Sequence, residues 1–455
     1  MEMVLEFLRD VLSQPALLIG IMSCVGLVAL KRPFHKVMTG TLKPILGYLM
    51  LAAGAGVIVS NLDPLGKMIE HGFHITGVVP NNEAIVAVAQ KVLGVETMSI
   101  LVVGLLMNLC IARFTKFKYV FLTGHHSLFM ACLMSAVLGT AGMSGMELIL
   151  VGGFLMGAWS AISPAIGQSY TSKVTDGDEI AIGHFGSLGY YLSAWVAQYV
   201  GKAEDSTEDI EIPEKWGFLR DSTLSTALTM IVFYLIAAIA AGSEFVSTLS
   251  GDMSPYLYAV MSAMNFAVGV TIVYSGVRMI LGDLIPAFQG IATKIIPNAI
   301  PAVDCAVFFT YAPTAVVLGF LSSFIGGIIG MLILGAVGGV LIIPGLVPHF
   351  FCGATAGIYG NATGGRRGAA VGAFLNGLAI TFLPAMALPV LGQLGFQNTT
   401  FGDADFAVMG LVLGNAYEWL GMTGIYGIVA IAALVLIIPN FIKTKGKVIN
   451  YVEED

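Results

Sequence analysis

Long apolar runs dominate the chain, and polar residues are confined to short connections between them. Runs of about 20 residues with few charges, enough to cross a bilayer as a helix, recur along nearly the whole length. The first covers residues 15–30 and is followed by the basic cluster KRPFHK, the reverse of a cleavable signal peptide. We therefore expect a retained first helix and an all-α polytopic membrane protein with about eleven transmembrane helices.

Short basic connections predict the orientation of these helices. They lie at residues 31–36, 113–118, 364–368 and 443–447. Cytoplasmic loops carry an excess of Lys and Arg, so all four should face the cytoplasm. This predicts a multi-pass protein of the bacterial inner membrane with its N-terminus outside, an outer connection over residues 61–95 and a cytoplasmic C-terminus.

Several apolar stretches are interrupted by Gly and Pro. Non-helical backbone at membrane depth persists only where it is buried in protein or lines a watery cavity. The interruptions SAISPAIG (160–167) and TYAPTAVV (310–317) therefore indicate broken helices or re-entrant segments beside a solute path.

An internal repeat relates the two halves of the chain. The segments GAGVIVSNLDP, starting at Gly54, and GVRMILGDLIP, starting at Gly276, share Gly, Ile, Leu and Pro at matching offsets. The basic loops give the two segments opposite directions across the membrane, so the repeat would be inverted, as in many transporters. We expect a first repeat over 1–222 that ends in the hydrophilic loop 202–222, a second over 223–438, and a cytoplasmic tail over 439–455.

Composition excludes several functions. Hydrophobic residues make up 57% of the chain and charged residues 11%, which leaves little for a soluble catalytic domain. The five cysteines form no CxxC pair, so we expect no disulfide, metal site or cofactor. No basic stripe indicates nucleic acid, and no HExxH or Asp-rich motif indicates an intramembrane enzyme. The acidic loop 202–221 fits either a solvated linker or a docking surface for a soluble partner.

Three ionisable residues in apolar context are candidates for solute binding. His125 and His184 each follow a glycine, where the backbone can approach a ligand closely, and neutral imidazole offers one donor and one acceptor. Asp304 lies in the apolar run PAVDCAVFF and fits either a ligand for sugar hydroxyls or a helix cap. Tyr311 and Thr314 lie in the same stretch and could supply hydroxyls.

Two other acidic positions carry weaker hypotheses. The sequence TDGDE (175–179) is typical of a solvated turn. Glu418 is a further carboxylate near membrane depth, although Tyr417 and Trp419 beside it are typical of an interfacial aromatic belt.

At these motifs the sequence resembles the ascorbate-type enzyme IIC proteins of the bacterial phosphotransferase system (PTS). The similar stretches include KPILGYLMLAAGAGVIVS, LTGH, KVTDGDEIAIGH, AVDCAVFFTYAPTAVVLGF and LIIPGLVPHFF. The resemblance implies a homodimer in which each chain has a core domain and a V-shaped scaffold domain, with elevator-like transport. It also implies soluble partners, EIIA and an EIIB whose phosphocysteine phosphorylates the sugar, so that this chain is a permease without catalytic residues of its own.

Substrate-binding positions carry over unevenly. His125, His184 and Asp304 match the family, as does Thr123 of the LTGH motif. The resemblance implies glutamines at three positions in the ascorbate transporters, where this chain has Phe129, Phe185 and Gly186. The lost amides would remove hydrogen bonds to a polar ligand, so the substrate could be ascorbate or a related sugar or polyol. An ion-coupled secondary transporter on the same scaffold is the alternative, with Asp304 or Glu418 binding the ion.

Overall fold

The computed structural model describes residues 11, 14–74, 77–78, 80, 82–210, 222–392 and 400–441. Helices account for most of them, as predicted. The α-helices are α2 (Pro15–Ala29), α3 (Phe34–Gly72), α4 (Asn82–Phe114), α5 (Gly124–Thr140), α6 (Gly145–Thr175), α7 (Ser187–Val200), α8 (Ser222–Ala241), α9 (Ser243–Ser250), α10 (Pro255–Lys294), α11 (Pro313–Ala336), α12 (Leu346–Gly392), α13 (Ala404–Leu420) and α14 (Met422–Phe441). A short 3-10 helix, η2 (Cys305–Thr310), precedes α11.

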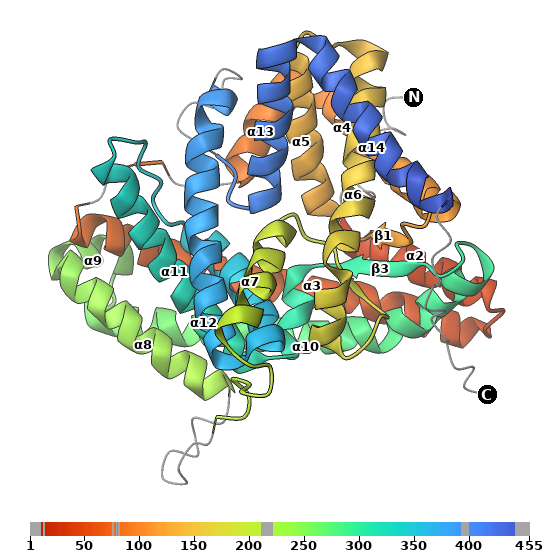
Figure 1. Cartoon of the computed structure of the whole chain (residues 1–455). Coiled ribbons are helices and arrows are strands. Elements are labelled where there is room, and N and C mark those ends of the chain that lie inside the picture. The colour runs from red at the N-terminus through yellow and green to blue at the C-terminus, as the bar shows by residue number, and fades with distance from the viewer. Residues whose placement is uncertain are drawn as a thin grey trace.

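The helices form two groups (Figure 1). Helices α3, α8 and α10 run across the lower part of the view, and α2 packs with them. Helices α5, α6, α12 and α13 stand upright above this layer. The first group comes from one stretch in each half of the chain, so the two halves interleave.

Close contact between α3 and α10 holds the first group together. The two helices are antiparallel, because a Cβ on Gly47 would lie 2.8 Å from the carbonyl oxygen of Gly276, and one on Gly54 would lie 2.8 Å from that of Gly269. Small residues at such crossings let helix backbones approach where lipid offers no hydrophobic driving force. Ile280, three to four residues beyond Gly276, is fully buried at the same crossing.

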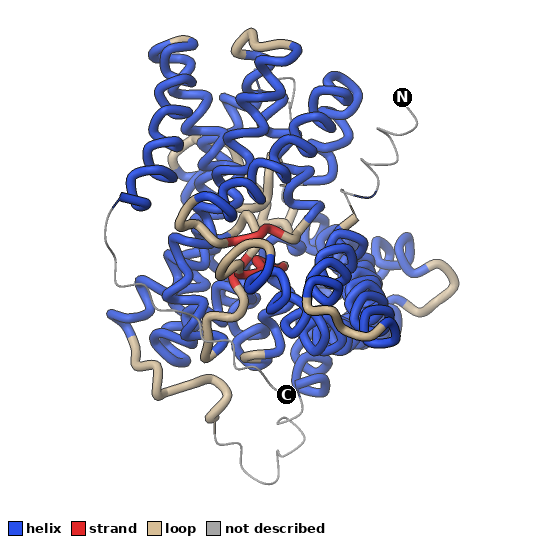
Figure 2. Tube along the Cα trace, turned by 90° about the vertical axis from the view of Figure 1, so that its right-hand side faces the viewer, coloured by secondary structure: helices blue, strands red, loops and turns tan. Residues whose placement is uncertain are grey.

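A small parallel sheet lies at the middle of the molecule (Figure 2). Its strands are β1 (Tyr119–Phe121), β2 (Ala181–Ile182) and β3 (Ile300–Val303), in the order β1-β3-β2. The register pairs Phe121 with Ala302, and Ala302 in turn with Ala181. Each strand supplies the backbone hydrogen bonds that a broken helix would otherwise lack. These short strands are an addition to the predicted all-α fold.

Helix α12 is a hairpin of two arms. Gly364 and Gly365 leave helical geometry, and Gly365 has a φ of 60° and a ψ of −154°. A Cβ on Gly360 would lie 2.4 Å from the carbonyl oxygen of Gly368, so the two arms meet directly beyond the turn. Arg366 N–H donates to the carbonyl oxygen of Asp205, which fastens the loop 201–210 to the hairpin tip.

Seven helices of the described chain are long and apolar enough to cross a bilayer, and eight if α8 and α9, bent by 116° at Gly242, count as one span. Length and composition alone therefore do not reach the expected eleven, because α5, α7 and α13 are shorter. The first helix, α2, lies where it was predicted. The chain is an all-α polytopic membrane protein.

One predicted helix break is wrong and the other is confirmed. Residues 160–167 lie inside the continuous helix α6, with Pro164 in its interior. The helix stays continuous through the proline, and the Tyr191 hydroxyl donates to the adjacent carbonyl oxygen of Ser163. Residues 310–317 contain a break, because η2 ends at Thr310 and α11 begins at Pro313.

The expected outer connection over residues 61–95 is also wrong in extent. Helix α3 continues to Gly72 and α4 begins at Asn82. Charged residues in this range, such as Asp63 and Lys67, are exposed on α3. The basic cluster 443–447 and the tail lie outside the described residues, as does the end of the acidic loop, 211–221.

Candidate functional site

The carboxyl ends of strands β1, β2 and β3 lie at the same edge of the sheet. Strand β1 leads through Leu122 and Thr123 into α5, β2 leads through residues 183–186 into α7, and β3 leads through Asp304 into η2. Because the strands are parallel, their carboxyl ends share one edge, which is where open α/β sheets bind ligands. Helix starts also present free N–H groups and a positive partial charge.

His125 and Asp304 meet at this edge. The His125 Nε2 lies 3.5 Å from Asp304 Oδ2, and the Tyr48 hydroxyl of α3 lies 3.4 Å from His125 Nδ1. The other carboxylate oxygen of Asp304 accepts a hydrogen bond from Ala306 N–H at 3.1 Å. Asp304 is therefore the cap of η2, and its second oxygen remains directed at His125. The side chain of His125 is 37% exposed, which leaves it open to a solute.

His126 and His184 form a pair of closely packed, mutually tilted rings beside it. Their ring centroids are 3.8 Å apart. The Gly186 N–H donates to His184 Nδ1 at 3.1 Å, and the Phe185 N–H donates to His126 Nδ1 at 3.3 Å. With each Nδ1 accepting, the neutral rings carry their hydrogens on Nε2. The pair therefore offers two imidazole N–H donors, suited to hydroxyl or carboxylate oxygens of a ligand.

A buried carboxylate from α13 adjoins His184. Asp403 Oδ1 accepts from the Cys352 thiol at 2.8 Å and lies 3.9 Å from His184 Nδ1. Its Oδ2 accepts from Asn82 Nδ2 at 2.5 Å, and the Asn82 carbonyl accepts from Gly402 N–H. A buried charge requires such hydrogen bonds. Asp403 thus ties the start of α4 and the arm of α12 to the histidine pair.

Asp405 holds the loop that carries His184. It is fully buried, and its carboxylate accepts hydrogen bonds from Ser187 Oγ at 2.7 Å and Leu188 N–H at 2.9 Å. Its own N–H donates to the carbonyl oxygen of Phe185, and Trp159 Nε1 donates to the carboxylate at 3.3 Å. These bonds fix the end of the β2–α7 loop and the start of α7, which directly follow His184.

Three further predicted residues lie at the same edge. Phe129 contacts His125 edge-on, with ring centroids 5.8 Å apart. Phe185 is fully buried and stacks on Phe121 at 4.6 Å, so its ring belongs to the core below the site. Thr123 is 1% exposed and its hydroxyl has no hydrogen-bond partner, which leaves that hydroxyl unused by the fold.

Tyr311 and Thr314 are not brought into this cluster. Thr314 is the second residue of α11, and its N–H and hydroxyl both donate to the carboxylate of Glu208 in the loop 201–210. The Tyr311 ring contacts Phe308 rather than any of the histidines in the described chain. Their assignment to the substrate site stays a prediction, now with less support. The loop around Glu208 also packs on the helices, more closely than a solvated linker would.

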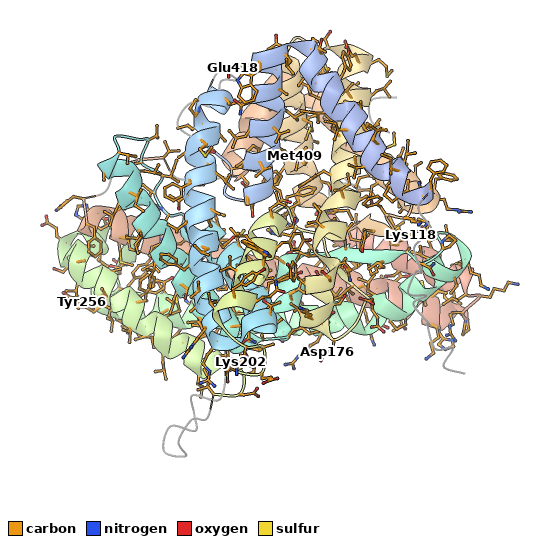
Figure 3. The ribbon with its side chains drawn as sticks, in the orientation of Figure 1. Lys118, Asp176, Lys202, Tyr256, Met409 and Glu418 are labelled. Atoms are coloured by element: carbon orange, nitrogen blue, oxygen red, sulfur yellow. The ribbon has the colours of Figure 1, made fainter. Side chains whose placement is uncertain are left out.

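The remaining acidic candidates lie elsewhere. Asp176 ends α6 in left-handed geometry, with a φ of 53°, so the sequence TDGDE forms the expected turn. Glu418 lies on the exposed last turn of α13 beside the exposed Trp419. Figure 3 shows Glu418 at the opposite end of the molecule from Asp176 and Lys202. Glu418 is therefore at the far end of α13 from the candidate site, and its place in an interfacial aromatic belt stays a prediction.

Two triads of the described chain have metal-ligand atoms within 4.8 Å of one another: His126, His184 and Asp403, and His184, Asp304 and Cys305. Coordination needs a free lone pair on the imidazole and a hydrogen on its other nitrogen. The backbone N–H groups that donate to Nδ1 impose the opposite arrangement on both rings. This donor set does not fit a metal, and we interpret it as a hydrogen-bonding site.

Sequence analysis missed several members of the site. His126, Tyr48, Asn82, Asp403 and Asp405 all contribute contacts. The pair of acidic residues in FGDADF followed a stretch rich in polar residues and gave no sign of burial. The doubled histidine of LTGHH was the one local signal, because both rings follow a strand end at the start of a helix.

Fold and candidate site together define a multi-pass membrane protein with a largely buried, polar cluster at the carboxyl edge of its sheet. The family model EIIC-GAT, described as a PTS system sugar-specific permease component, matches residues 10–405. The chain therefore belongs to the family of PTS sugar-specific permease components. A curated relative, the "Ascorbate-specific PTS system EIIC component" of Mycoplasma pneumoniae, is 26% identical over an alignment of 474 residues that covers 90% of this chain and 70% of the relative.

Proposed function

We propose that the chain binds ascorbate or a related sugar or polyol and carries it across the inner membrane for phosphorylation. One observation carries this proposal: the His125–Asp304 pair and the closely packed His126–His184 pair converge where three strands end and three helices begin. A carboxylate accepts from sugar hydroxyls, and imidazole N–H groups donate to them. Membership of the PTS permease family supports a sugar as the solute.

The partners follow from the same family. EIIA and EIIB supply the phosphoryl group through a phosphocysteine on EIIB, and the chain presents the substrate hydroxyl without a phosphoryl-transfer residue of its own. We further propose a homodimer with its N-terminus outside and its C-terminus in the cytoplasm. The loop 201–210 and the tip of the α12 hairpin, which contact each other, would then share the cytoplasmic side with EIIB.

Phe129 makes this candidate site less polar than a substrate site lined by glutamine amides. Its ring borders His125 and offers no hydrogen bond. A site that hydrogen-bonds a particular substrate oxygen discriminates against ligands that lack this oxygen. Loss of the amide that makes the hydrogen bond therefore lowers the specificity for that substrate. We therefore place ascorbate among the candidate substrates rather than alone, although the relative in Mycoplasma pneumoniae carries that name.

Transport by an elevator-like movement rests on two inverted repeats, 1–222 and 223–438. Helices α3 and α10, α4 and the η2–α11 pair, and α5 and the first arm of α12 begin about 222 residues apart. Contacts between the halves repeat in the same way. Gly47 meets Ile280 and Gly269 meets Ile58. The bridge between Val78 and Ile342 likewise corresponds to the pairing of Ile300 with Tyr119.

The repeat suggests how the parts would move. Helices α2, α3 and α8–α10 would form the V-shaped scaffold domain, and the helices around the sheet would form the core domain. The core would carry the site past the scaffold, because packed interfaces switch between discrete arrangements rather than deform continuously. The Tyr48–His125 contact, which joins α3 to α5, would open during that step.

Uptake into membrane vesicles tests the proposal. Labelled ascorbate, hexitols and hexoses would be offered with and without phosphoenolpyruvate and the soluble PTS proteins. We expect accumulation of a phosphorylated product that depends on the phosphoryl donor. Uptake of unmodified solute that collapses with the ion gradient would contradict it.

The second outcome would favour an ion-coupled secondary transporter on this scaffold. The specific observation behind that alternative is the set of buried carboxylates around His184, namely Asp304, Asp403 and Asp405. Ionisable groups at membrane depth commonly mark ion or proton pathways. Coupling to a proton or sodium gradient would assign one of them to the ion.

A further inference from the structure

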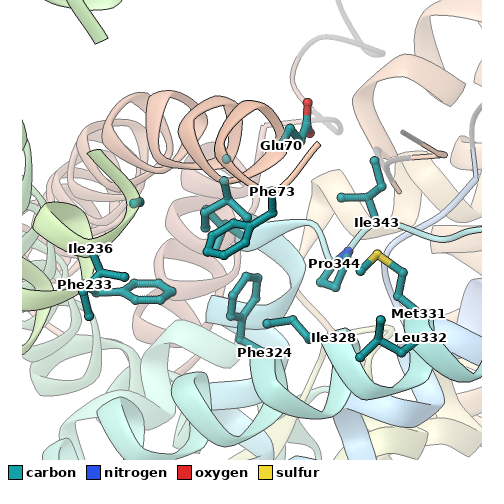
Figure 4. A pocket seen from close by; sticks show the side chains of 14 residues that line it. Glu70, Phe73, Phe233, Ile236, Phe324, Ile328, Met331, Leu332, Ile343 and Pro344 are labelled. Carbon is teal, nitrogen blue, oxygen red and sulfur yellow. The ribbon is translucent and has the colours of Figure 1, made fainter. Parts of the chain in front are cut away.

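A second pocket, apolar and distinct from the site of His125, His126 and His184, lies between α3, α8 and α11. Its volume is about 430 Å³, within the usual range of small-ligand sites. Figure 4 shows the rings of Phe73, Phe233 and Phe324 and the side chain of Met331 around it. Glu70 lies at its edge and is the one ionisable residue among those that line it. Such a lining does not suit a sugar, whose hydroxyls would find no partners.

The pocket lies near the ends of all three helices. Glu70 is two residues before the end of α3, Ala237 is four before the end of α8, and Leu332 is four before the end of α11. Apolar spans end near the bilayer surface, and from its place at the end of α3 we infer that Glu70 lies at the headgroup level. Phe73, Ile236 and Leu332 are 56%, 55% and 62% exposed, which opens the pocket sideways towards lipid.

We propose that this pocket binds one membrane phospholipid that has a primary amine in its headgroup, such as phosphatidylethanolamine. An acyl chain fills the apolar space and the ammonium donates to the Glu70 carboxylate. Lys67, one turn earlier on the same helix, is exposed and complements the lipid phosphate. An anionic lipid without the amine would meet Glu70 with like charge, and a choline headgroup has no N–H to donate.

The glycines of α3 supply a matched pair of variants. A Cβ on Gly66 would have Leu346 Cδ1 as its nearest neighbour, at 3.8 Å, so a larger side chain there enters the pocket without displacing backbone. Gly56, on the same helix, is exposed and has nothing within 4 Å of its Cβ position. Gly66→Leu therefore blocks the pocket, whereas Gly56→Leu makes the same change on the lipid-facing surface.

Native mass spectrometry of the delipidated full chain measures the binding. Phosphatidylethanolamine and phosphatidylcholine with identical acyl chains would be titrated separately. We expect one saturable phosphatidylethanolamine per chain, at least tenfold weaker binding of phosphatidylcholine, and at least tenfold weaker binding of phosphatidylethanolamine to Gly66→Leu than to Gly56→Leu. Glu70→Gln should abolish the preference between the two headgroups.

Two results would overturn the proposal. Equal binding of phosphatidylethanolamine to Gly66→Leu and the parent would remove the pocket as the site. Equal affinity of the parent for both headgroups, unchanged in Glu70→Gln, would remove the role of the carboxylate. If Gly66→Leu fails to fold, Ile236→Trp provides the same block, because that side chain is half exposed and can carry the larger ring at the mouth.

Discussion

Asp304 has two oxygens with two tasks, and a single substitution separates them. Oδ1 caps η2 through Ala306 N–H, while Oδ2 lies beside His125. Asparagine keeps a carbonyl oxygen for the cap but removes the negative charge. The two roles that the sequence left open are therefore compatible in one side chain.

We expect Asp304→Asn to bind substrate about 10- to 100-fold more weakly, as for loss of a hydrogen bond to a charged group. Its melting temperature should stay near that of the parent. Asp304→Ala, which also loses the cap, should in addition melt at lower temperature, because a lost cap costs about 1 kcal/mol. Isothermal titration with the substrate identified by uptake, together with thermal unfolding, measures both. Parent-like affinity in Asp304→Asn would remove this residue from the site.

His184 is predicted to act through its Nε2–H. His184→Ala removes that donor and leaves the Gly186 N–H and the Tyr190 hydroxyl, which lies 2.8 Å from Nδ1, without their acceptor. We expect substrate affinity to fall about tenfold or more while the protein still inserts into the membrane. Binding by purified His184→Ala equal to that of the parent would contradict the role.

Asp405 is expected to position His184 without touching the substrate. In Asp405→Asn, the side-chain NH₂ group replaces one of the two oxygens that accept from Ser187 Oγ and Leu188 N–H. Two donors then face each other, and one of them is left buried without an acceptor, which costs about 1–3 kcal/mol. We expect weaker binding and a lower melting temperature together. Asp252→Asn, in an exposed turn, is the matched control and should change neither. Loss of binding in Asp405→Asn with full thermal stability would argue instead for direct contact with the substrate.

Phe129, rather than Phe185, is the position at which to test specificity. Phe185 is packed against Phe121, so a glutamine there would bury an amide in apolar surroundings. Phe129 borders His125, where a glutamine could reach the solute. We expect Phe129→Gln to improve ascorbate binding relative to binding of a hexitol. An unchanged ratio of the two affinities would show that this position does not select the substrate.

Local sequence identified the residues that stand at helix starts and strand ends. His125, His184 and Asp304 were conspicuous because each is ionisable within an apolar run. Asp403 and Asp405 were not, because their burial depends on α7 and on the arm of α12, which are distant in sequence. Tertiary contacts determine which carboxylates are buried at the candidate site, and local sequence does not show these contacts.

Helices of membrane-spanning length were predictable from apolar runs, whereas their interruptions were not. Pro164 suggested a break, but α6 continues through it, and the hydroxyl of Tyr191 on α7 donates to the adjacent carbonyl oxygen of Ser163. The strands are two to four residues long, and such segments give no periodic signal. Their pairing joins three separate parts of the chain, so no single window of sequence could predict the sheet.

The α3–α10 crossing offers a test at the level of elements. A Cβ at Gly276 would lie 2.6 Å from the carbonyl oxygen of Gly47 and 2.6 Å from the Leu51 nitrogen, so Gly276→Ala must push the helices apart. Overpacking of this kind costs about 1–3 kcal/mol. Gly282→Ala on the same helix has nothing within 4 Å and should be neutral or slightly stabilising. Thermal unfolding in detergent compares them, and equal melting temperatures would contradict the tight crossing.

At the scale of the molecule, sequence and structure both support an internal repeat whose two copies are offset by about 222 residues. The sequence offered four identities between Gly54–Pro64 and Gly276–Pro286. The structure adds helices that begin at matching places, α3 and α10 of nearly equal length, and reciprocal contacts between the halves. If the halves are inverted copies, they can exchange conformations, which would provide a physical basis for the proposed elevator-like alternating access.

Locking the two groups of helices together should stop transport and leave binding intact. Phe233 lies on α8 of the first group, and Phe324 lies on α11, which packs along α12 of the second group. The two rings contact each other, with centroids 5.7 Å apart. In a background with Cys24 and Cys110 replaced by serine, Phe233→Cys and Phe324→Cys would be joined by a short thiol-specific crosslinker. We expect uptake to fall to background, and reduction of a cleavable linker to restore it.

A crosslink inside the first group is the control. The Thr223 and Thr271 hydroxyl oxygens, on α8 and α10, are 3.1 Å apart. Thr223→Cys with Thr271→Cys should therefore crosslink without joining the group to the helices around the sheet, and uptake should continue. If the first pair transports at the parental rate after complete crosslinking, the core and scaffold do not move past each other at this contact. If both pairs stop transport, movement within the scaffold is also required, and the division into a fixed and a mobile group must be redrawn.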